Sequence, residues 1–373
     1  MTNYARLKDH NSALVRDDLS RHNEVWRGLP EIVNFNHTDI CDLRCIMCFE
    51  SVNPGRARIS VPRIREILRQ VLPTARKLKL TTAGEPLLLD FDEIVELARE
   101  YQVLLAMITN GTHLSVDRYL KMKDVLHHLT ISIDSHDKDI FTKIRGKGAF
   151  DKIMRNLAEL RKVAEFHRFS FHIQMVLMRS NLETLPAFVA WAKELGVNAV
   201  NVTRLHFPFD GLQEKEDIFG DFPAEVRDKH IHDAVDVAKR LGVNLGLADL
   251  GYPTVIAAPS PPVLPERPPT YVCGWVAQEI YIDPQEQVYP CCIGDRELVM
   301  GDLKTHSFMD VWNGPKYRKL RRSMFEQKLK GYCANCKLYA PIPDDAAFDL
   351  RQIYKKQRQG SLLGRMVGAL RKS

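Results

Sequence analysis

The chain has 373 residues, of which 45% are hydrophobic and 27% charged, so it is globular and can bury one large core and a smaller second one. Its formal charge of +6 is concentrated in residues 351–373, which hold seven basic and no acidic side chains, so the other 350 residues sum to −1. A neutral body argues against a broad phosphate-binding surface. We therefore predict no nucleic-acid partner.

Targeting segments and the spacing of the cysteines bear on the cellular compartment of the protein. No secretory signal opens the chain, and no apolar run is long enough to span a membrane. The eight cysteines occur as CxxxCxxC, CC, CxxC and a single residue, a pattern that favours metal ligation over disulfides. We predict a cytoplasmic protein.

The N-terminal part is predicted to lead into a cysteine-rich loop. Residues 1–30 form a polar extension with a short helix or two, and EIVNFNHTDIC reads as a strand that ends at Cys41. Cys41, Cys45 and Cys48 follow in CDLRCIMC. Iron–sulfur clusters normally have four cysteine ligands, so three thiolates leave one iron open. A structural zinc site is the alternative.

This spacing resembles the hallmark of the radical S-adenosylmethionine (radical SAM) superfamily. The resemblance implies that the three cysteines hold a [4Fe-4S] cluster and that the methionine moiety of S-adenosylmethionine (SAM) binds the open iron. It further implies that one electron cleaves SAM to a 5′-deoxyadenosyl radical. Ferredoxin or flavodoxin is then the expected electron donor.

After this loop, helical and strand patterns alternate. Strands separated by helices imply parallel pairing with right-handed crossovers, and the chemistry of such folds lies on the loops after the strands. We predict the α/β class, with a partial (β/α)6 TIM-like barrel of the radical SAM type over residues 31–252. The predicted helix and strand pairs are 61–72 with 78–84, 91–101 with 103–111, 116–125 with 129–135, 150–165 with 171–178, and 182–195 with 199–205.

The loops after the second and third strands carry the first candidate cofactor residues. Gly84 and Glu85 lie in a stretch that resembles the family's GGEP motif, with Ala83 in place of the first glycine. By resemblance, this loop binds the methionine amino group, and Glu85 accepts a hydrogen bond from it. Asn110, in a TNG turn after the third strand, is predicted to line the same pocket.

The later strands supply further candidates. Ser132 and Asp134 fall on one face of the fourth strand, where a ribose diol or a methionine carboxylate would bind them; a solvent-facing pair is the alternative. Arg145 is predicted to pair with the SAM carboxylate, unless it is a surface residue. On the sixth strand and beyond it we assign Thr203 to the cofactor, and Arg204 and His206 to the substrate.

A second cysteine set follows a stiff linker. Residues 253–270 include seven prolines, and we place the domain boundary there. Cys273, the end of a hairpin and a closing CxxC resemble the auxiliary-cluster domain of the SPASM/twitch type, a small α+β unit predicted over residues 271–345. The resemblance implies a second [4Fe-4S] cluster without an open iron, which suits electron transfer. Its expected ligands are Cys273, Cys291, Cys333 and Cys336.

Three features of this region stay open. A zinc site is the alternative for the four cysteines. Cys292 is spare: a packed cysteine, a substitute ligand or a hydrogen-atom donor. Glu286 stands near the place of the usual hairpin glycine. The basic tail over residues 346–373 has an apolar helical stripe, which packs on the protein itself or makes a weak membrane contact.

The sequence thus predicts a two-cluster radical SAM enzyme, oxidoreductase-like, that removes a hydrogen atom from its substrate. The first prediction for the substrate is a small polar metabolite such as a sugar or aminocyclitol. Peptide-modifying relatives often carry an N-terminal leader-binding domain, and the 40 residues before Cys41 are too few for one. Modification of a ribosomally made peptide is the alternative. A zinc-binding, non-catalytic protein is the third hypothesis.

Overall fold

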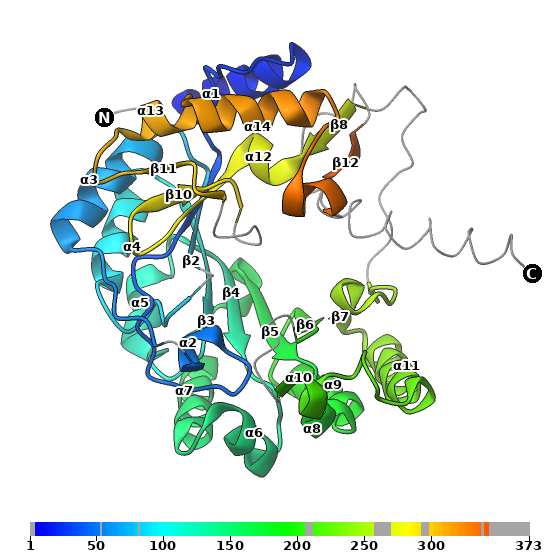
Figure 1. Ribbon diagram of the computed structural model, residues 1–373. Helices are drawn as coiled ribbons and strands as arrows, with labels where there is room; N and C mark the ends of the chain where they lie inside the picture. The colour runs from blue at the N-terminus through cyan, green and yellow to red at the C-terminus, as the bar shows by residue number, and fades with distance from the viewer. Residues whose placement is uncertain are drawn as a thin grey trace, which may run out of the picture.

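The structure, a computed structural model, describes residues 4–52, 54–80, 83–205, 212–256, 270–291, 298–336 and 339–342. Its main feature is one large sheet with the strand order β11-β10-β9-β1-β2-β3-β4-β5-β6-β7. The sheet curves into an open arc, and helices cover its convex side (Figure 1). The predicted α/β fold with a partial barrel is confirmed.

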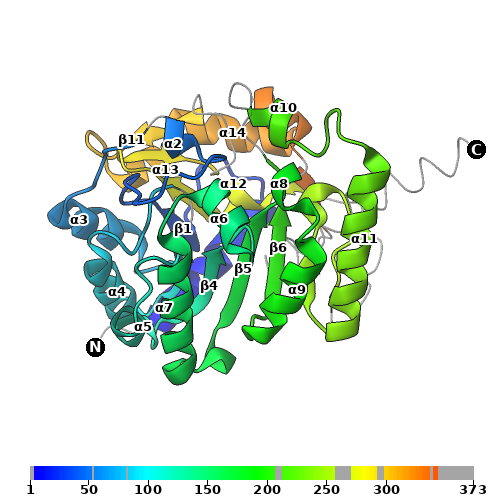
Figure 2. The ribbon, with the colours of Figure 1, turned by 90° about the horizontal axis from the view of Figure 1, so that it is seen from below.

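The first seven strands are parallel and follow each other in sequence order. They are β1 (Ile32–Phe35), β2 (Lys77–Leu80), β3 (Leu104–Thr109), β4 (Leu126–Ser132), β5 (Ser170–Val176), β6 (Ala199–Thr203) and β7 (Asn244–Gly246). The crossovers between them contain α2 (Phe49–Val52), α3 (Val61–Val71), α4 (Phe91–Glu100), α5 (Val116–Met122), α6 (Lys138–Arg145), α7 (Ala149–Val163), α8 (Arg179–Leu182), α9 (Leu185–Glu194), α10 (Leu212–Glu216) and α11 (Ala224–Leu241). Figure 2, seen from below, shows α7 beside β4 and β5, α9 beside β6, and α11 packed next to α9 at the edge of the molecule.

Alternating side chains give the sheet an apolar and a polar face. In β5, Phe171, Ile173 and Met175 are buried, whereas the residues between them are partly exposed. The apolar residues belong to one core cluster with helix residues such as Ile64 and Ile94. Successive strand residues point to opposite faces, so the polar side chains lie on the concave face. The core therefore sits between sheet and helices, and the concave face stays polar.

The C-terminal part extends the same sheet. β9 (Glu279–Ile282) pairs in parallel with β1, and β10 (Gln287–Tyr289) and β11 (Gly301–Asp302) continue it in antiparallel fashion. The predicted hairpin is therefore present, and its pairing with β1 was not anticipated. β8 (Thr270–Cys273) and β12 (Tyr339–Ile342) form a separate two-stranded sheet. Residues 257–269 of the proline-rich linker lie outside the described residues, and the domain boundary stays a prediction.

The hairpin turn carries the predicted departure from glycine. Glu286 adopts a positive φ of 65°, the left-handed region that glycine occupies most easily. Its carboxylate forms an ion pair with Arg63 of α3, and the same guanidinium donates to the backbone oxygen of Leu303 at 2.9 Å. Glu286 thus ties the hairpin to the barrel helices, a contact that glycine would lack.

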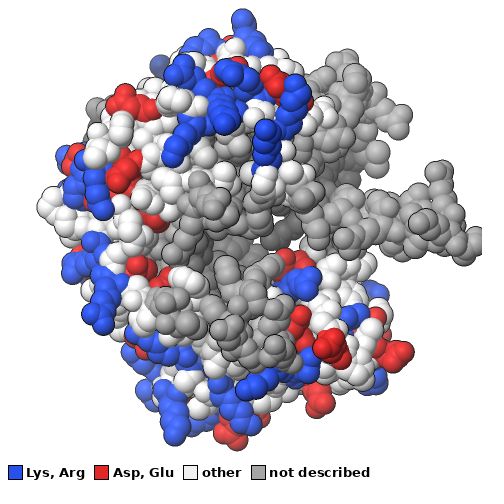
Figure 3. All heavy atoms as spheres, in the orientation of Figure 1, with Lys and Arg blue, Asp and Glu red and all other residues white. Residues whose placement is uncertain are grey.

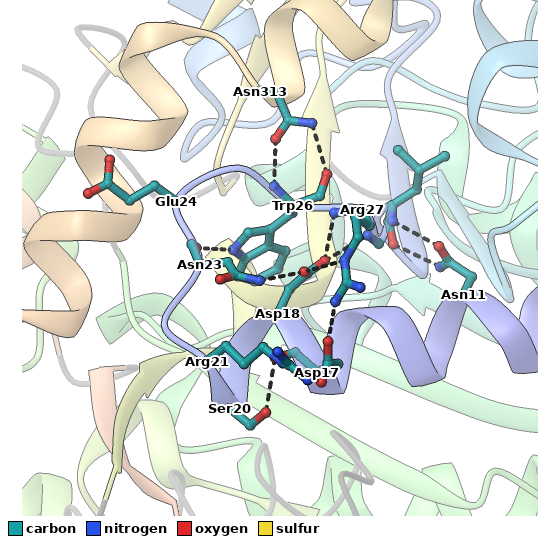
Figure 4. Close-up of polar contacts among 12 residues, drawn as sticks. Asn11, Asp17, Asp18, Ser20, Arg21, Asn23, Glu24, Trp26, Arg27 and Asn313 are labelled. Carbon is teal, nitrogen blue, oxygen red and sulfur yellow. Dashed lines mark hydrogen bonds and ion pairs between the residues drawn. The ribbon is translucent and has the colours of Figure 1, made fainter.

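The N-terminal extension joins the barrel to the C-terminal helices. α1 (Tyr4–Ser20) is followed by a loop that is held by Asp18, which accepts hydrogen bonds from the backbone N–H groups of Arg27 and Gly28 (Figure 4). The side chain of Asn313 accepts from Trp26 N and donates to Trp26 O, both at 2.9 Å. Asn313 lies between α13 (Phe308–Trp312) and α14 (Pro315–Phe325), so these contacts fix both helices against the N-terminal extension.

The described surface is mixed in charge, apart from one basic region. Lys and Arg side chains gather over α14 (Figure 3). Its exposed basic residues are Lys316, Arg318, Lys319 and Arg322. The body thus has a local basic face in spite of its near-zero total charge. Among the described residues, no helix is both long and apolar enough to cross a membrane.

Candidate active site

The three cysteines of CDLRCIMC lie in the loop after β1, at the carboxyl end of the parallel strands. All three are free thiols; Cys45 is buried, and Cys41 and Cys48 are partly exposed. The backbone N–H of Ile46 donates to the backbone oxygen of Ile144 in α6 at 2.9 Å, which anchors the loop. The loop therefore occupies the edge of the sheet where enzymes of this architecture place their chemistry.

Hydrogen-bond donors surround these sulfur atoms. Asn110 Nδ2 lies 3.7 Å from Cys41 Sγ, and the guanidinium of Arg145 lies 3.7 Å from Cys45 Sγ. Burial raises the pKa of Cys41 to about 12 and also raises the pKa values of Cys45 and Cys48. Thiols in such a place become thiolates only when a cation compensates the charge, as a metal or cluster does. Three free thiols with these donors beside them fit a [4Fe-4S] cluster that takes three cysteine ligands from this loop.

Glu85 holds the turn after β3, next to the cysteine loop, in place. Its carboxylate is 1% exposed and accepts hydrogen bonds from Thr109 Oγ1 (2.5 Å), Asn110 N (2.7 Å) and Leu87 N (3.1 Å). Burial raises its pKa to about 7. Both oxygens are therefore occupied within the protein, so this structure assigns Glu85 a role in holding the loop. A direct bond to the SAM amino group stays a prediction.

Gly84 brings this loop close to the cysteine loop. Its φ is +65°, and an added Cβ would lie 2.4 Å from the backbone oxygen of Thr38. Next to it, Glu85 N donates to the backbone oxygen of Ile40 at 2.9 Å, directly before Cys41. Only glycine fits this approach, which agrees with the predicted role of the motif.

Asp42 is a residue of this site that the sequence did not single out. It accepts hydrogen bonds from Asn110 Nδ2 (2.8 Å) and Thr112 Oγ1 (2.7 Å). Asn110 therefore links Glu85, Asp42 and Cys41 in one network, beyond its predicted place as a lining residue. A short polar residue directly after the first cysteine, facing a TNG turn, was the available signal.

Asp134 and Arg145 form a buried ion pair. Asp134 is 0% exposed, and its two oxygens accept from Arg145 Nε (2.5 Å) and Val176 N (2.8 Å). Although burial opposes the charged form, the charges of Asp134 and Cys45 raise the pKa of Arg145 above its usual value. Asp134 thus holds the guanidinium that reaches Cys45. The surface alternative for Arg145 is wrong, and contact of either residue with SAM stays a prediction.

The remaining barrel candidates lie at the ends of β4 and β6. Ser132 and Thr203 are partly exposed on the concave face, in agreement with a ligand-facing role. Arg204 places its guanidinium 4.4 Å from the ring centre of Phe219, and its backbone N donates to Asp249 Oδ2 at 2.9 Å. His206 lies outside the described residues.

The second cysteine set interacts electrostatically. Burial and, to a lesser extent, the charges of Cys291 and Cys336 raise the pKa of Cys273 to about 12; burial and then the charge of Cys336 raise the pKa of Cys333. All four are free thiols. Cys273 lies at the start of α12 (Gly274–Gln278), which leads into β9. These free thiols could hold one shared cluster, although the described residues contain no three His, Cys, Asp or Glu side chains already arranged as a metal site. Cys292 lies outside the described residues.

The two cysteine sets lie beyond opposite ends of the β1 and β9 pair. Because β9 is parallel to β1, with Glu279 opposite Ile32, Cys273 precedes the end at which both strands begin. The antiparallel β10 returns Cys291 to that end, whereas Cys41 follows the other end of β1. The concave face of the sheet therefore extends from one cysteine set to the other.

Comparison with known proteins agrees with this arrangement. The model of the radical SAM superfamily matches residues 35–192, and that of an iron–sulfur cluster-binding domain, SPASM, matches residues 273–337. The chain is 27% identical to mycofactocin maturase MftC of Mycolicibacterium smegmatis, over 83% of this chain and 76% of that protein. It is 23% identical to the AdoMet-dependent heme synthase of Methanosarcina barkeri (82% and 88%) and 24% identical to the PqqA peptide cyclase of Granulibacter bethesdensis (76% and 74%).

Solved structures show the same fold. Streptococcus suis SuiB bound to S-adenosylmethionine superposes with a TM-score of 0.62 at 17% identity, covering 86% of this chain and 73% of that one. Native anSMEcpe with bound AdoMet and Kp18Cys peptide superposes with a TM-score of 0.58 at 16% identity, covering 92% and 99%. These structures show the fold. The two matching family models show that the chain belongs to the radical SAM superfamily and is an enzyme that uses iron–sulfur clusters and S-adenosylmethionine.

Proposed function

We propose that this enzyme is a maturase that modifies a ribosomally made peptide. The observation that carries this proposal is the similarity to MftC along 83% of the chain, joined by the similarity to a peptide cyclase. The small polar metabolite favoured by the sequence has less support, because that prediction depended on the short N-terminal extension. The peptide alternative takes its place.

The geometry of the sheet supports a chain-like substrate. β7 and β11 end the strand order and do not pair with each other in the described part of the chain, so the sheet forms an arc and not a closed barrel (Figure 1). Its concave face is lined by polar side chains such as Gln174 and Asn201. A peptide can lie along this face from the open side, with hydrogen bonds to its backbone.

Each group of residues then has a defined task. When bound, the cluster and SAM supply a carbon radical that removes a hydrogen atom from the substrate. Cys41, Cys45 and Cys48 would hold that cluster, and the network of Glu85 and Asn110 fixes their loop. The four C-terminal cysteines would hold the auxiliary cluster, beyond the other end of the concave face.

Anaerobic reconstitution tests this proposal. The purified enzyme is supplied with iron, sulfide, SAM and a reductant, together with each short peptide encoded beside its gene, and the peptide is examined by mass spectrometry. We expect a SAM-dependent mass change of one peptide and formation of 5′-deoxyadenosine. No mass change with any such peptide would contradict the proposal.

A second candidate has one observation in its favour. The heme synthase match spans 88% of that protein, so a heme precursor is the alternative substrate class. The same assay with heme precursors in place of peptides separates the two. Turnover of a heme precursor without peptide modification would replace the maturase proposal.

A further inference from the structure

The concave face carries one buried polar cluster that no role described above uses. Asn34 of β1, Lys79 of β2, Ala106 of β3 and His128 of β4 are direct neighbours in the register of four adjacent strands. They form one row across the sheet, and Ala106 contributes only a methyl group. This row lies between the two cysteine sets, because β1 leads from Asn34 toward Cys41.

Glu279 of β9 contacts this row from the next position on the same face, opposite Ile32 and two residues before Tyr281, which pairs with Asn34. Its Oε2 accepts hydrogen bonds from Lys79 Nζ at 2.8 Å and from Asn34 Nδ2 at 2.9 Å. Glu279 is 0% exposed and Asn34 is 1% exposed. A carboxylate that is fully buried needs such partners, since an uncompensated charge in the interior is costly. Lys79 and Asn34 supply them to one oxygen only.

Two acceptors of this cluster have no hydrogen-bond partner among the described residues. They are Glu279 Oε1 and Asn34 Oδ1. The orientation of the Asn34 amide is fixed, because its Nδ2 also donates to the backbone oxygen of Ile280 at 3.0 Å. Buried acceptors normally find a donor, so two unpaired ones in contacting residues mark a place where a bound water or a ligand supplies it.

The charges around these atoms select the kind of donor. Lys79 neutralises Glu279, and burial lowers the pKa of His128 to about 3, so this imidazole is uncharged at neutral pH. The charges of Lys77 and Lys79 also lower the pKa of His128. The surroundings therefore carry no excess negative charge that would attract a cation, and a neutral N–H group fits better.

We propose that Glu279 and Asn34, braced by Lys79, form a substrate subsite that accepts hydrogen bonds from neutral N–H groups, the amide of a peptide being the matching class. This inference rests on the proposed function, because it names what on the peptide is recognised. Lys79 positions the carboxylate. Glu279 and Asn34 contact the substrate.

Glu279→Gln is the sharpest test variant. The new side chain keeps the shape and leaves one oxygen for Lys79 and Asn34, so its amide nitrogen takes the place of Oε1. An acceptor thereby becomes a donor, which repels an incoming N–H group. Asn34→Ala removes the second acceptor. Glu183→Gln, at an exposed position, makes the same chemical change away from the sheet.

The probe is N-acetylglycinamide, which carries a peptide N–H and a primary amide. Saturation-transfer NMR on the reconstituted, full-length enzyme measures its binding, and the iron content and melting temperature of each variant check its folding. We expect binding to the parent enzyme and to Glu183→Gln, and a dissociation constant roughly 10-fold to 100-fold higher for Glu279→Gln and Asn34→Ala, as expected for lost hydrogen bonds to buried groups.

Equal binding to the parent enzyme and to both folded variants would overturn the subsite, as would an absence of binding to the parent enzyme. A failure of the proposed function has another signature. In that case N-acetylglycinamide binding still depends on Glu279 and Asn34, but none of the peptides encoded beside the gene is modified.

Discussion

Two buried glutamates near opposite ends of the parallel strands differ in how their oxygens are used. Glu85, at the carboxyl end of the strands, receives three hydrogen bonds that engage both oxygens. Glu279, at the first residue of β9, engages one oxygen and leaves Oε1 without a partner in the described part of the chain. Burial alone therefore does not reveal a ligand site. The count of satisfied oxygens separates a carboxylate that holds a loop from one that awaits a donor.

The largest effect is expected when the cysteine ligands are removed from the loop near Glu85. Changing Cys41, Cys45 and Cys48 together to Ala should abolish SAM cleavage and remove about half of the iron, because only one of two clusters loses its ligands. Iron analysis and chromatography of 5′-deoxyadenosine measure both. A triple variant that keeps all its iron would show that the loop holds no cluster.

The Asp134 and Arg145 pair should show the next largest effect. Asp134→Ala leaves the guanidinium buried without its partner, which typically costs about 3–5 kcal/mol of stability. The displaced guanidinium should also weaken SAM binding by roughly 1–3 kcal/mol, through lost hydrogen bonds at the site. Denaturation of the cluster-free protein and SAM calorimetry are the measurements.

An exposed ion pair provides the matched control for this prediction. Asp233 pairs with Lys229 on the surface of α11, and Asp233→Ala should cost less than about 1 kcal/mol. Equal losses for Asp134→Ala and Asp233→Ala would contradict the account of the buried pair. Unchanged SAM affinity in Asp134→Ala would remove that pair from the cofactor site.

Glu85 should make the stability of the cluster-free protein depend on pH. Burial raises its pKa from 4.5 to about 7 in the folded state. The folded chain therefore keeps a proton that the unfolded chain loses, so this contribution is complete below pH 4.5 and is lost as the pH rises toward 7. Glu85→Gln should flatten that part of the stability profile, measured by denaturation at several pH values. A profile identical to that of the parent would contradict the shift.

The last expected effect is the stability change in Glu279→Gln. At Glu85, glutamine turns an amide nitrogen toward groups that already donate, which costs about 1–3 kcal/mol. At Glu279, no described donor faces Oε1, so the loss comes from Oε2, where the ammonium of Lys79 loses its charged partner. Replacing both residues in Lys79→Met/Glu279→Gln leaves neither charge unpaired and should recover most of this loss. Denaturation of the single and double variants at one pH decides the comparison. A loss that persists in the double variant would mean that Oε1 is satisfied within the protein.

The sequence predicted the parts of this fold that depend on local patterns. Alternation in FHIQMVLM and the cysteine spacings lead directly to β5 and to the two cysteine sets. The pairing of β9 with β1 was not predictable, because it joins residues more than 240 positions apart and leaves no local signal. Glu279 went unnoticed for the same reason. A single glutamate before a hairpin gains meaning only when Asn34 and Lys79 lie beside it.

The candidate site, like the fold, could be predicted from the sequence only in part. The motifs identified Glu85, Asn110 and Asp134, and the structure brings all three to the cysteine loop. Their hydrogen-bond partners decide what each does, and these lie on other strands. Asp134 binds Arg145 and Val176, so both of its oxygens are already used. Sequence patterns therefore located the site, and the roles required the geometry.

Hydrogen transfer from a peptide tests the central claim most directly. A fully deuterated copy of the peptide that binds is incubated with the reconstituted enzyme, SAM and reductant, and the 5′-deoxyadenosine is analysed by mass spectrometry. The account predicts that deuterium from the peptide appears in 5′-deoxyadenosine as the peptide is modified. Unlabelled 5′-deoxyadenosine beside an unchanged peptide would contradict it.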